Sequence, residues 1–156
     1  MRRYLVIASA VLVFLSTSGL SMAEDDPFVG TWKLNVALSQ YDPGPPPMSQ
    51  TRTWQPSGKV TVQGIDAKGN SRTYGYTIKP DGKDRPTFGG GGNGAESVAG
   101  KRIDAHTMKA TFKKGGKPIE SAILSVSENG IRLTIVSRNS ASNEKSFHNV
   151  QVWDKQ

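Results

Sequence analysis

The feature that most constrains the fold is an alternation of apolar and polar residues with a period of two. It runs through segments 60–63, 73–78, 108–113 and 131–135. Successive side chains of a β-strand point to opposite faces, so this pattern predicts strands with one buried face and one wet face. Beyond a short helical turn near 36–41, no segment has the 3.6-residue period of an amphipathic helix.

Short clusters of Gly, Asn, Asp and Pro separate the alternating runs, for example at 56–58, 66–70, 80–82 and 128–130. Such clusters supply the positive φ angles that tight hairpins need. They predict about nine or ten strands joined by short turns. The expected strands are 30–36, 49–55, 58–64, 71–79, 84–88, 95–103, 107–113, 117–127, 130–138 and 146–154.

Two segments interrupt this series. Residues 41–47 contain four prolines, which donate no backbone hydrogen bond, so we expect an extended connection and not a strand. Residues 89–94 are five glycines and Asn93. A phosphate loop would continue with Lys-Ser/Thr and a helix, and both are missing here. We therefore interpret 89–94 as a flexible hairpin loop, which could act as a lid beside a pocket.

The expected fold is all-β, with little helix. A series of antiparallel hairpins has two exposed edges, and closure into an up-and-down barrel removes both. Such closure pairs the first strand with the last. The alternating run that ends at Trp153 fits the last strand.

The N-terminus resembles a secretory signal peptide. Arg2 and Arg3 precede an apolar run over 4–15, and small residues lead to Ala23. That run is shorter than the ~20 residues that span a bilayer. We therefore expect 1–23 to be a signal peptide and 24–156 to be one exported barrel domain. The periplasm is the expected location, and the extracellular space is the alternative.

Charge and cysteine content limit the possible binding partners and the ways in which the domain can be stabilised. The formal charge of the whole chain is +7, and removal of Arg2 and Arg3 lowers it to +5. The basic residues are scattered, with Lys101-Arg102 and Lys113-Lys114 as the densest pairs, so nucleic-acid binding is not expected. With no cysteine, the domain must be stabilised by its hydrophobic core.

The start of the domain carries a family resemblance. Residues 28–35 contain Gly30-x-Trp32, and 39–45 and 149–155 continue the similarity. These segments resemble small exported bacterial lipocalin-like proteins of uncharacterised function, which have calycin-type β-barrels. The resemblance implies that Trp32 closes one end of the barrel and packs on a basic residue from the last strands. Arg138 and Lys155 are both candidates for that residue.

Inward-facing residues of the strands are candidates for ligand contact. A barrel of eight or more strands can enclose one small ligand or be filled by its own side chains. Tyrosines suit a ligand cavity because each has an apolar ring and a hydroxyl. An arginine, Arg52 or Arg132, could meet a carboxylate or phosphate, although an outward, solvated position is the simpler interpretation. The predicted ligand-binding residues are Arg52, Trp54, Tyr74, Tyr76, Phe112, Leu133 and Ile135.

No catalytic or metal motif is present. His106 and His148 have no metal-ligand spacing, and no Gly-x-Ser-x-Gly motif occurs. We therefore expect no enzyme activity, no metal and no cofactor. His148 is the best candidate base for the alternative of an enzyme in the barrel mouth.

The leading hypothesis is an exported soluble protein that binds a small apolar or amphiphilic ligand. The main alternative is an interaction or inhibitor module with a packed core that acts through its loops, 41–47 and 89–94. An outer-membrane barrel is disfavoured because Lys33, Lys59 and Lys109 lie on the faces opposite the apolar ones. Once the signal is cleaved, no membrane-spanning segment is expected, and the sequence leaves the oligomeric state open.

Overall fold

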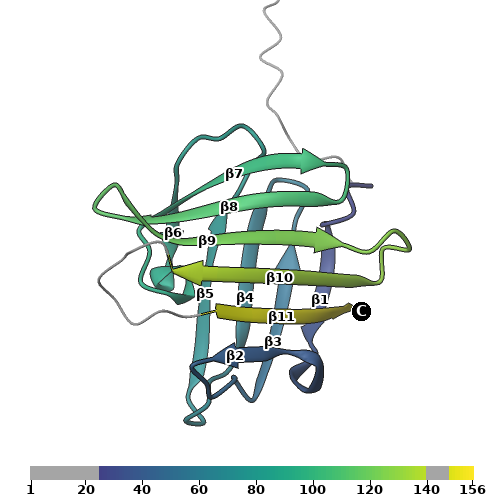
Figure 1. Cartoon of the computed structure of the whole chain (residues 1–156), viewed down its shortest axis with the longest axis vertical. Helices are drawn as coiled ribbons and strands as arrows, with labels where there is room; N and C mark the ends of the chain where they lie inside the picture. Colours follow the sequence, from purple (N-terminus) through teal and green to yellow (C-terminus); the bar gives the residue numbers. More distant parts are fainter. Residues whose placement is uncertain (1–24, 140–147) are drawn as a thin grey trace, which may run out of the picture.

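The computed structural model describes residues 25–139 and 148–156, and these form one closed antiparallel β-barrel (Figure 1). Ten strands pair in chain order, and β1 also pairs with β11, which closes the barrel. The signal-peptide prediction for 1–23 lies outside the described residues. The ten strands are β1 (Gly30–Leu34), β3 (Ser49–Trp54), β4 (Lys59–Ile65), β5 (Ser71–Thr77), β6 (Arg85–Phe88), β7 (Ser97–Asp104), β8 (Thr107–Lys114), β9 (Lys117–Val126), β10 (Arg132–Asn139) and β11 (His148–Lys155).

This architecture confirms the predicted fold class, an all-β up-and-down barrel of calycin-like form. In Figure 1, β7 to β11 form the near wall and cross β1, β3, β4 and β5 behind them. Closure pairs Trp32 with Lys155 and Leu34 with Trp153. The two edges of the sheet therefore satisfy each other's backbone groups.

The connection from β1 to β3 differs from the prediction. A single 3₁₀ turn, η1 (Val36–Leu38), confirms the first half of the helical turn expected near 36–41. It leads into a short strand, β2 (Gln40–Asp42), which pairs with β11 beside the barrel. The prediction that Tyr41 and Asp42 lie outside any strand was wrong, because both precede the first proline and keep their backbone N–H groups. The following residues, 43–47, belong to no strand, as predicted.

The interior is apolar at one end and becomes polar toward the other. Phe28, Trp32, Trp54 and Trp153 are fully buried or nearly so at the apolar end. The Phe28 and Trp54 rings lie 5.1 Å apart, and the Trp32 indole N–H donates to the Phe28 carbonyl at 3.0 Å. These aromatic side chains close this end of the barrel.

The N-terminal segment is fixed over this closed end from outside. The carboxylate of Asp26 forms an ion pair with the Arg102 guanidinium of β7. That guanidinium also lies 5.0 Å from the centre of the Phe28 ring. Charge pairing and a cation–π contact therefore hold Phe28 in place as a plug.

Lys155 is the basic residue that packs on Trp32. Its ammonium nitrogen lies 5.2 Å from the centre of the indole ring. Arg138 is exposed at the far end of β10, so it does not take this role. Gly30 lies beside this pair with a φ of +139°, a backbone conformation that favours glycine over residues with a side chain. The glycine of the Gly-x-Trp motif therefore fits the backbone conformation of β1 next to the contact between Trp32 and Lys155.

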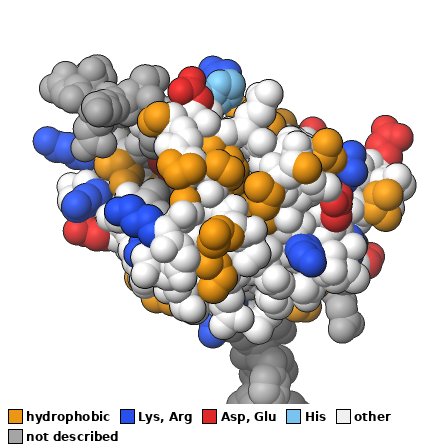
Figure 2. Space-filling view, turned by 90° about the horizontal axis from the view of Figure 1, so that it is seen from below, with side chains coloured by type: hydrophobic (Ala, Val, Ile, Leu, Met, Phe, Trp, Pro, Cys, Tyr) orange, Lys and Arg blue, Asp and Glu red, His pale blue; other side chains and the backbone are white. Residues whose placement is uncertain are grey.

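The outer surface shows no large charged patch on the face seen in Figure 2, where basic side chains lie around scattered apolar ones. The large apolar side chains that are exposed come from separate elements. Within 25–139 and 148–156, no helix is long and apolar enough to cross a membrane. Among the described residues, the exposed large hydrophobic ones are Leu38, Met48, Phe88, Ile103, Ile123 and Ile131.

We expect Gly75→Ala to destabilise the barrel. Gly75 lies on the outer side of β5 under the Phe88 ring, and a Cβ there would come 2.2 Å from the Val60 carbonyl oxygen. Forcing a methyl group into such a contact lowers the free energy of unfolding by about 1–3 kcal/mol. Urea denaturation followed by circular dichroism measures the loss.

Gly44→Ala is the matched control, because the nearest atom to its added Cβ lies 3.6 Å away. Its free energy of unfolding should stay within about 0.5 kcal/mol of the wild type. Equal stability of the two variants would contradict the close packing of β4, β5 and β6 around Gly75.

Candidate functional site

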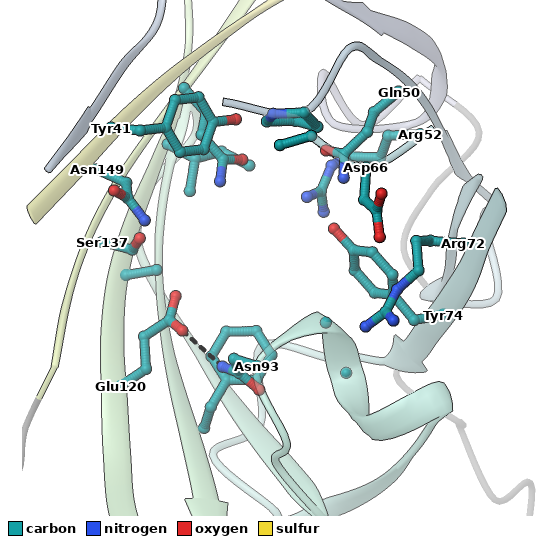
Figure 3. Close-up of a pocket in the computed structure, with 18 of the residues that line it drawn as sticks. Tyr41, Gln50, Arg52, Asp66, Arg72, Tyr74, Asn93, Glu120, Ser137 and Asn149 are labelled. Carbon is teal, nitrogen blue, oxygen red and sulfur yellow. Dashed lines mark hydrogen bonds between the residues drawn. The ribbon is translucent and has the colours of Figure 1, made fainter. Parts of the chain in front are cut away.

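A cavity of about 590 Å³ occupies the polar end of the barrel, opposite the buried tryptophans. Its wall combines apolar side chains from the inner faces of β8, β9 and β10 with polar ones from β2, β3, β5 and β11 (Figure 3). Its rim is built from the 43–47 connection, the turn after β4 and the 3₁₀ turn η2 (Gly89–Gly92). The interpretation of 89–94 as a loop beside a pocket therefore agrees with its position.

Five of the seven predicted ligand-binding residues line this cavity: Arg52, Tyr74, Tyr76, Phe112 and Ile135. The other two, Trp54 and Leu133, do not. Each lies on the same strand face as a lining residue but two positions nearer the closed end, which is a displacement of about 7 Å. The structure places both in the buried core. Contact with a ligand stays a prediction for all seven.

Arg52 is the most unusual residue of the wall. Its side chain is on β3, and only 4% of the residue is exposed. Its Nη1 donates to the Tyr76 hydroxyl at 2.7 Å, and the guanidinium lies 4.7 Å from the centre of the Trp153 ring. None of the ion pairs within the described part of the chain involves Arg52. Its Nε also has no hydrogen-bond partner there.

Tyrosines surround the guanidinium. The hydroxyl of Tyr41, on β2, is buried without a hydrogen-bond partner in the described structure, and it points into the cavity in Figure 3. Burial raises the pKa of Tyr41 and that of Tyr74, so both phenols stay protonated at neutral pH and can donate hydrogen bonds. The ring of Tyr76 packs edge-on against Phe112, with 5.3 Å between the ring centres.

Sequence reasoning missed several polar residues of the wall. It treated polar positions as outward-facing, although strand alternation gives the necessary signal. Counting by twos from Ile135 reaches Ser137, and counting back from Trp153 reaches Gln151 and Asn149. The missed lining residues include Tyr41, Gln50, Glu120, Ser137, Asn149 and Gln151.

The two histidines lie outside the cavity lining. His148 is exposed, because the inward positions of β11 are its odd-numbered neighbours. This removes the candidate base of the enzyme alternative from the cavity. His106 sits in the turn between β7 and β8. The described residues contain no group of His, Asp and Glu that could hold a metal ion.

Comparison with known proteins supports the barrel fold but assigns neither a family nor a function. No protein-family model matches the chain, and no curated protein sequence matches it. Among solved structures, the chain is similar to the zebrafish ileal bile acid-binding protein in complex with cholic acid, with a TM-score of 0.50. The sequences are 14% identical over 83% of this chain and 99% of the zebrafish chain. At this identity the likeness concerns the barrel alone.

Proposed function

We propose that this protein binds a small amphiphilic molecule inside the barrel, with an anionic group of the ligand at Arg52. The observation that carries the proposal is a buried guanidinium on a cavity wall without a carboxylate partner among the described residues. A buried charge is costly unless it is paired. An anionic ligand would supply the pair.

The groups around Arg52 suit a carboxylate or a similar oxyanion. A guanidinium donates several hydrogen bonds in a planar array that matches such a group. The hydroxyl of Tyr41, which has no hydrogen-bond partner in the described part of the chain, is a further donor facing the same space. The hydroxyl of Tyr76 already accepts from Arg52, which holds the guanidinium in position.

The remainder of the wall suits an apolar body. Ala110, Phe112, Leu124 and Ile135 line the cavity on the inner faces of β8, β9 and β10. A volume of about 590 Å³ lies within the ~300–1,000 Å³ range of small-molecule sites. The zebrafish barrel was crystallised with cholic acid, which is an amphiphilic acid, and this analogy adds support from the fold.

The loops of the interaction-module alternative also belong to the cavity. Pro45 and Pro47 of the 43–47 connection and Gly91 and Gly92 of η2 all line it. The segments that this alternative assigns to a protein partner are therefore placed where they would contact a bound small molecule. This position favours ligand binding over docking of a partner on the loops.

We also propose that the protein works outside the cytoplasm, on the basis of the signal-like sequence at 1–23. Expression of the full chain in a bacterium, followed by cell fractionation and intact-mass measurement, tests this. The expected product is a soluble periplasmic or extracellular chain that begins at Glu24. A cytoplasmic chain that retains the N-terminus would contradict export.

Calorimetric titration with decanoate and decanol tests the ligand proposal. The two molecules share an apolar chain and differ in the charge of the head group. Hydrogen bonds to charged groups contribute about 1.5–3 kcal/mol, so decanoate should bind at least about 10-fold more tightly. Equal affinity for both, or binding of neither, would overturn an anion site at Arg52.

A further inference from the structure

The cavity has a second polar region, across from Arg52. It is centred on Glu120 of β9, with Ser137 of β10, Asn149 of β11 and Asn93 beside it (Figure 3). Of the apolar residues of the wall, Phe112 pairs with Glu120, whereas Ala110, Leu124 and Ile135 lie nearer the closed end. A molecule in the cavity would therefore contact polar groups of different chemistry on two sides.

The side chain of Glu120 is held in place by donors from two elements. The Asn93 amide donates to its Oε2 at 2.5 Å, and the hydroxyl of Ser137 also hydrogen-bonds to the carboxylate. The Asn93 side-chain oxygen accepts from the Ala95 backbone N–H at 2.9 Å. This second bond fixes the amide so that its NH₂ group faces Glu120.

Glu120 has no ion-pair partner among the residues that the structure describes. Arg52 acts on it only through space, and burial outweighs that attraction and raises the pKa of the carboxyl group. A carboxylate has about four acceptor positions, of which Asn93 and Ser137 use two. The remaining positions are available to a donor in the cavity.

We propose that Glu120 selects ligands that carry, besides the anionic group, a second group that donates a hydrogen bond. This inference rests on the proposed function, since it assumes that the anionic group lies at Arg52. The ligand class is then a bipolar acid, such as a hydroxy acid or an amino acid with a sizeable apolar body. A hydroxyl and an ammonium group both satisfy the acceptor, and the test below separates them.

A purely structural role for Glu120 predicts a different result. Through Asn93 the carboxylate also holds the end of η2, and η2 packs on the ring of Tyr74. If Glu120 only held this turn, its loss would change the affinity for every ligand by the same factor. The informative quantity is therefore the ratio of two affinities in the same variant.

The experiment measures dissociation constants for unsubstituted, ω-hydroxy and ω-amino acids with six- and ten-carbon chains. In the wild type we expect the hydroxy or the amino acid of one chain length to bind about 10-fold more tightly than the unsubstituted acid. In Glu120→Ala this ratio should fall to about 1. Glu128→Ala, at an exposed turn near the closed end, is the matched control and should keep the wild-type ratio.

Glu120→Gln identifies the donor. An amide still accepts a hydrogen bond but carries no charge, so a hydroxyl preference should largely survive and an ammonium preference should disappear. A wild-type ratio near 1, or a ratio that survives Glu120→Ala, would overturn the role of Glu120. Failure of the unsubstituted acids to bind better than the matching alcohols would instead overturn the anion site at Arg52.

Discussion

Truncation of Trp32 to alanine is expected to reduce the free energy of unfolding by about 3–5 kcal/mol, the usual effect of removing a fully buried aromatic side chain. Trp32 has no exposed surface, its indole donates to the Phe28 carbonyl, and Lys155 packs on its ring. Loss of the ring would leave a cavity beside the paired strands β1 and β11 and expose this end of the barrel interior to water. The free energy of unfolding of a domain of this size is about 5–15 kcal/mol, so this loss should bring the variant close to unfolding.

Denaturation by urea, followed by far-ultraviolet circular dichroism, measures this effect without relying on tryptophan fluorescence. Ile131→Ala is the control, because 59% of Ile131 is exposed at the same end of the barrel. It should change the stability by less than about 0.5 kcal/mol. A Trp32→Ala variant as stable as Ile131→Ala would show that Trp32 does not close the barrel.

Arg52→Met is expected to abolish the preference for decanoate over decanol. Methionine keeps much of the volume and removes the charge, so the affinity ratio should fall from at least about 10 to about 1. The side chain of Arg52 faces the cavity and pairs with no carboxylate in the described structure. Titration of the variant with both compounds measures the ratio.

Arg72→Met is the matched control for this prediction. Arg72 also lines the cavity but is exposed near the rim, where water screens its charge. Its replacement should lower the ratio by no more than about 2-fold, in line with the small energies of exposed charges. A larger effect for Arg72 than for Arg52 would place the anionic group at the rim.

The fold was predictable because each strand carries a local signal. Alternation and turn residues located all ten barrel strands to within a few residues, and the need to remove sheet edges indicated closure. Strand β2 was missed because three residues next to a proline-rich segment give almost no alternation. Its pairing with β11 depends on contacts between residues 106 to 110 positions apart in the chain.

Only part of the candidate site could be predicted from the sequence. Alternation shows which side chains point inward, and the inward positions that it predicts for Tyr74, Tyr76 and Phe112 agree with the cavity lining. It does not show how deep along the barrel axis each inward residue lies, so Trp54 and Leu133 were grouped with them. The outward, solvated position preferred for Arg52 was wrong, because its side chain is buried in the wall against Tyr76 and Trp153. Glu120 and the other polar inward residues of β9, β10 and β11 were not among the predicted site residues, because polar residues usually face water.

The most direct test of the central claim is an NMR measurement of contacts between ¹³C-labelled decanoate and methyl groups of the protein. If the ligand lies inside the barrel, nuclear Overhauser effects will connect its chain with Ala110, Leu124 and Ile135, which line the cavity. The exposed methyl groups of Ile103 and Ile123 will show none. Contacts only with the exposed methyl groups, or no contacts at saturating decanoate, would contradict ligand binding in the barrel.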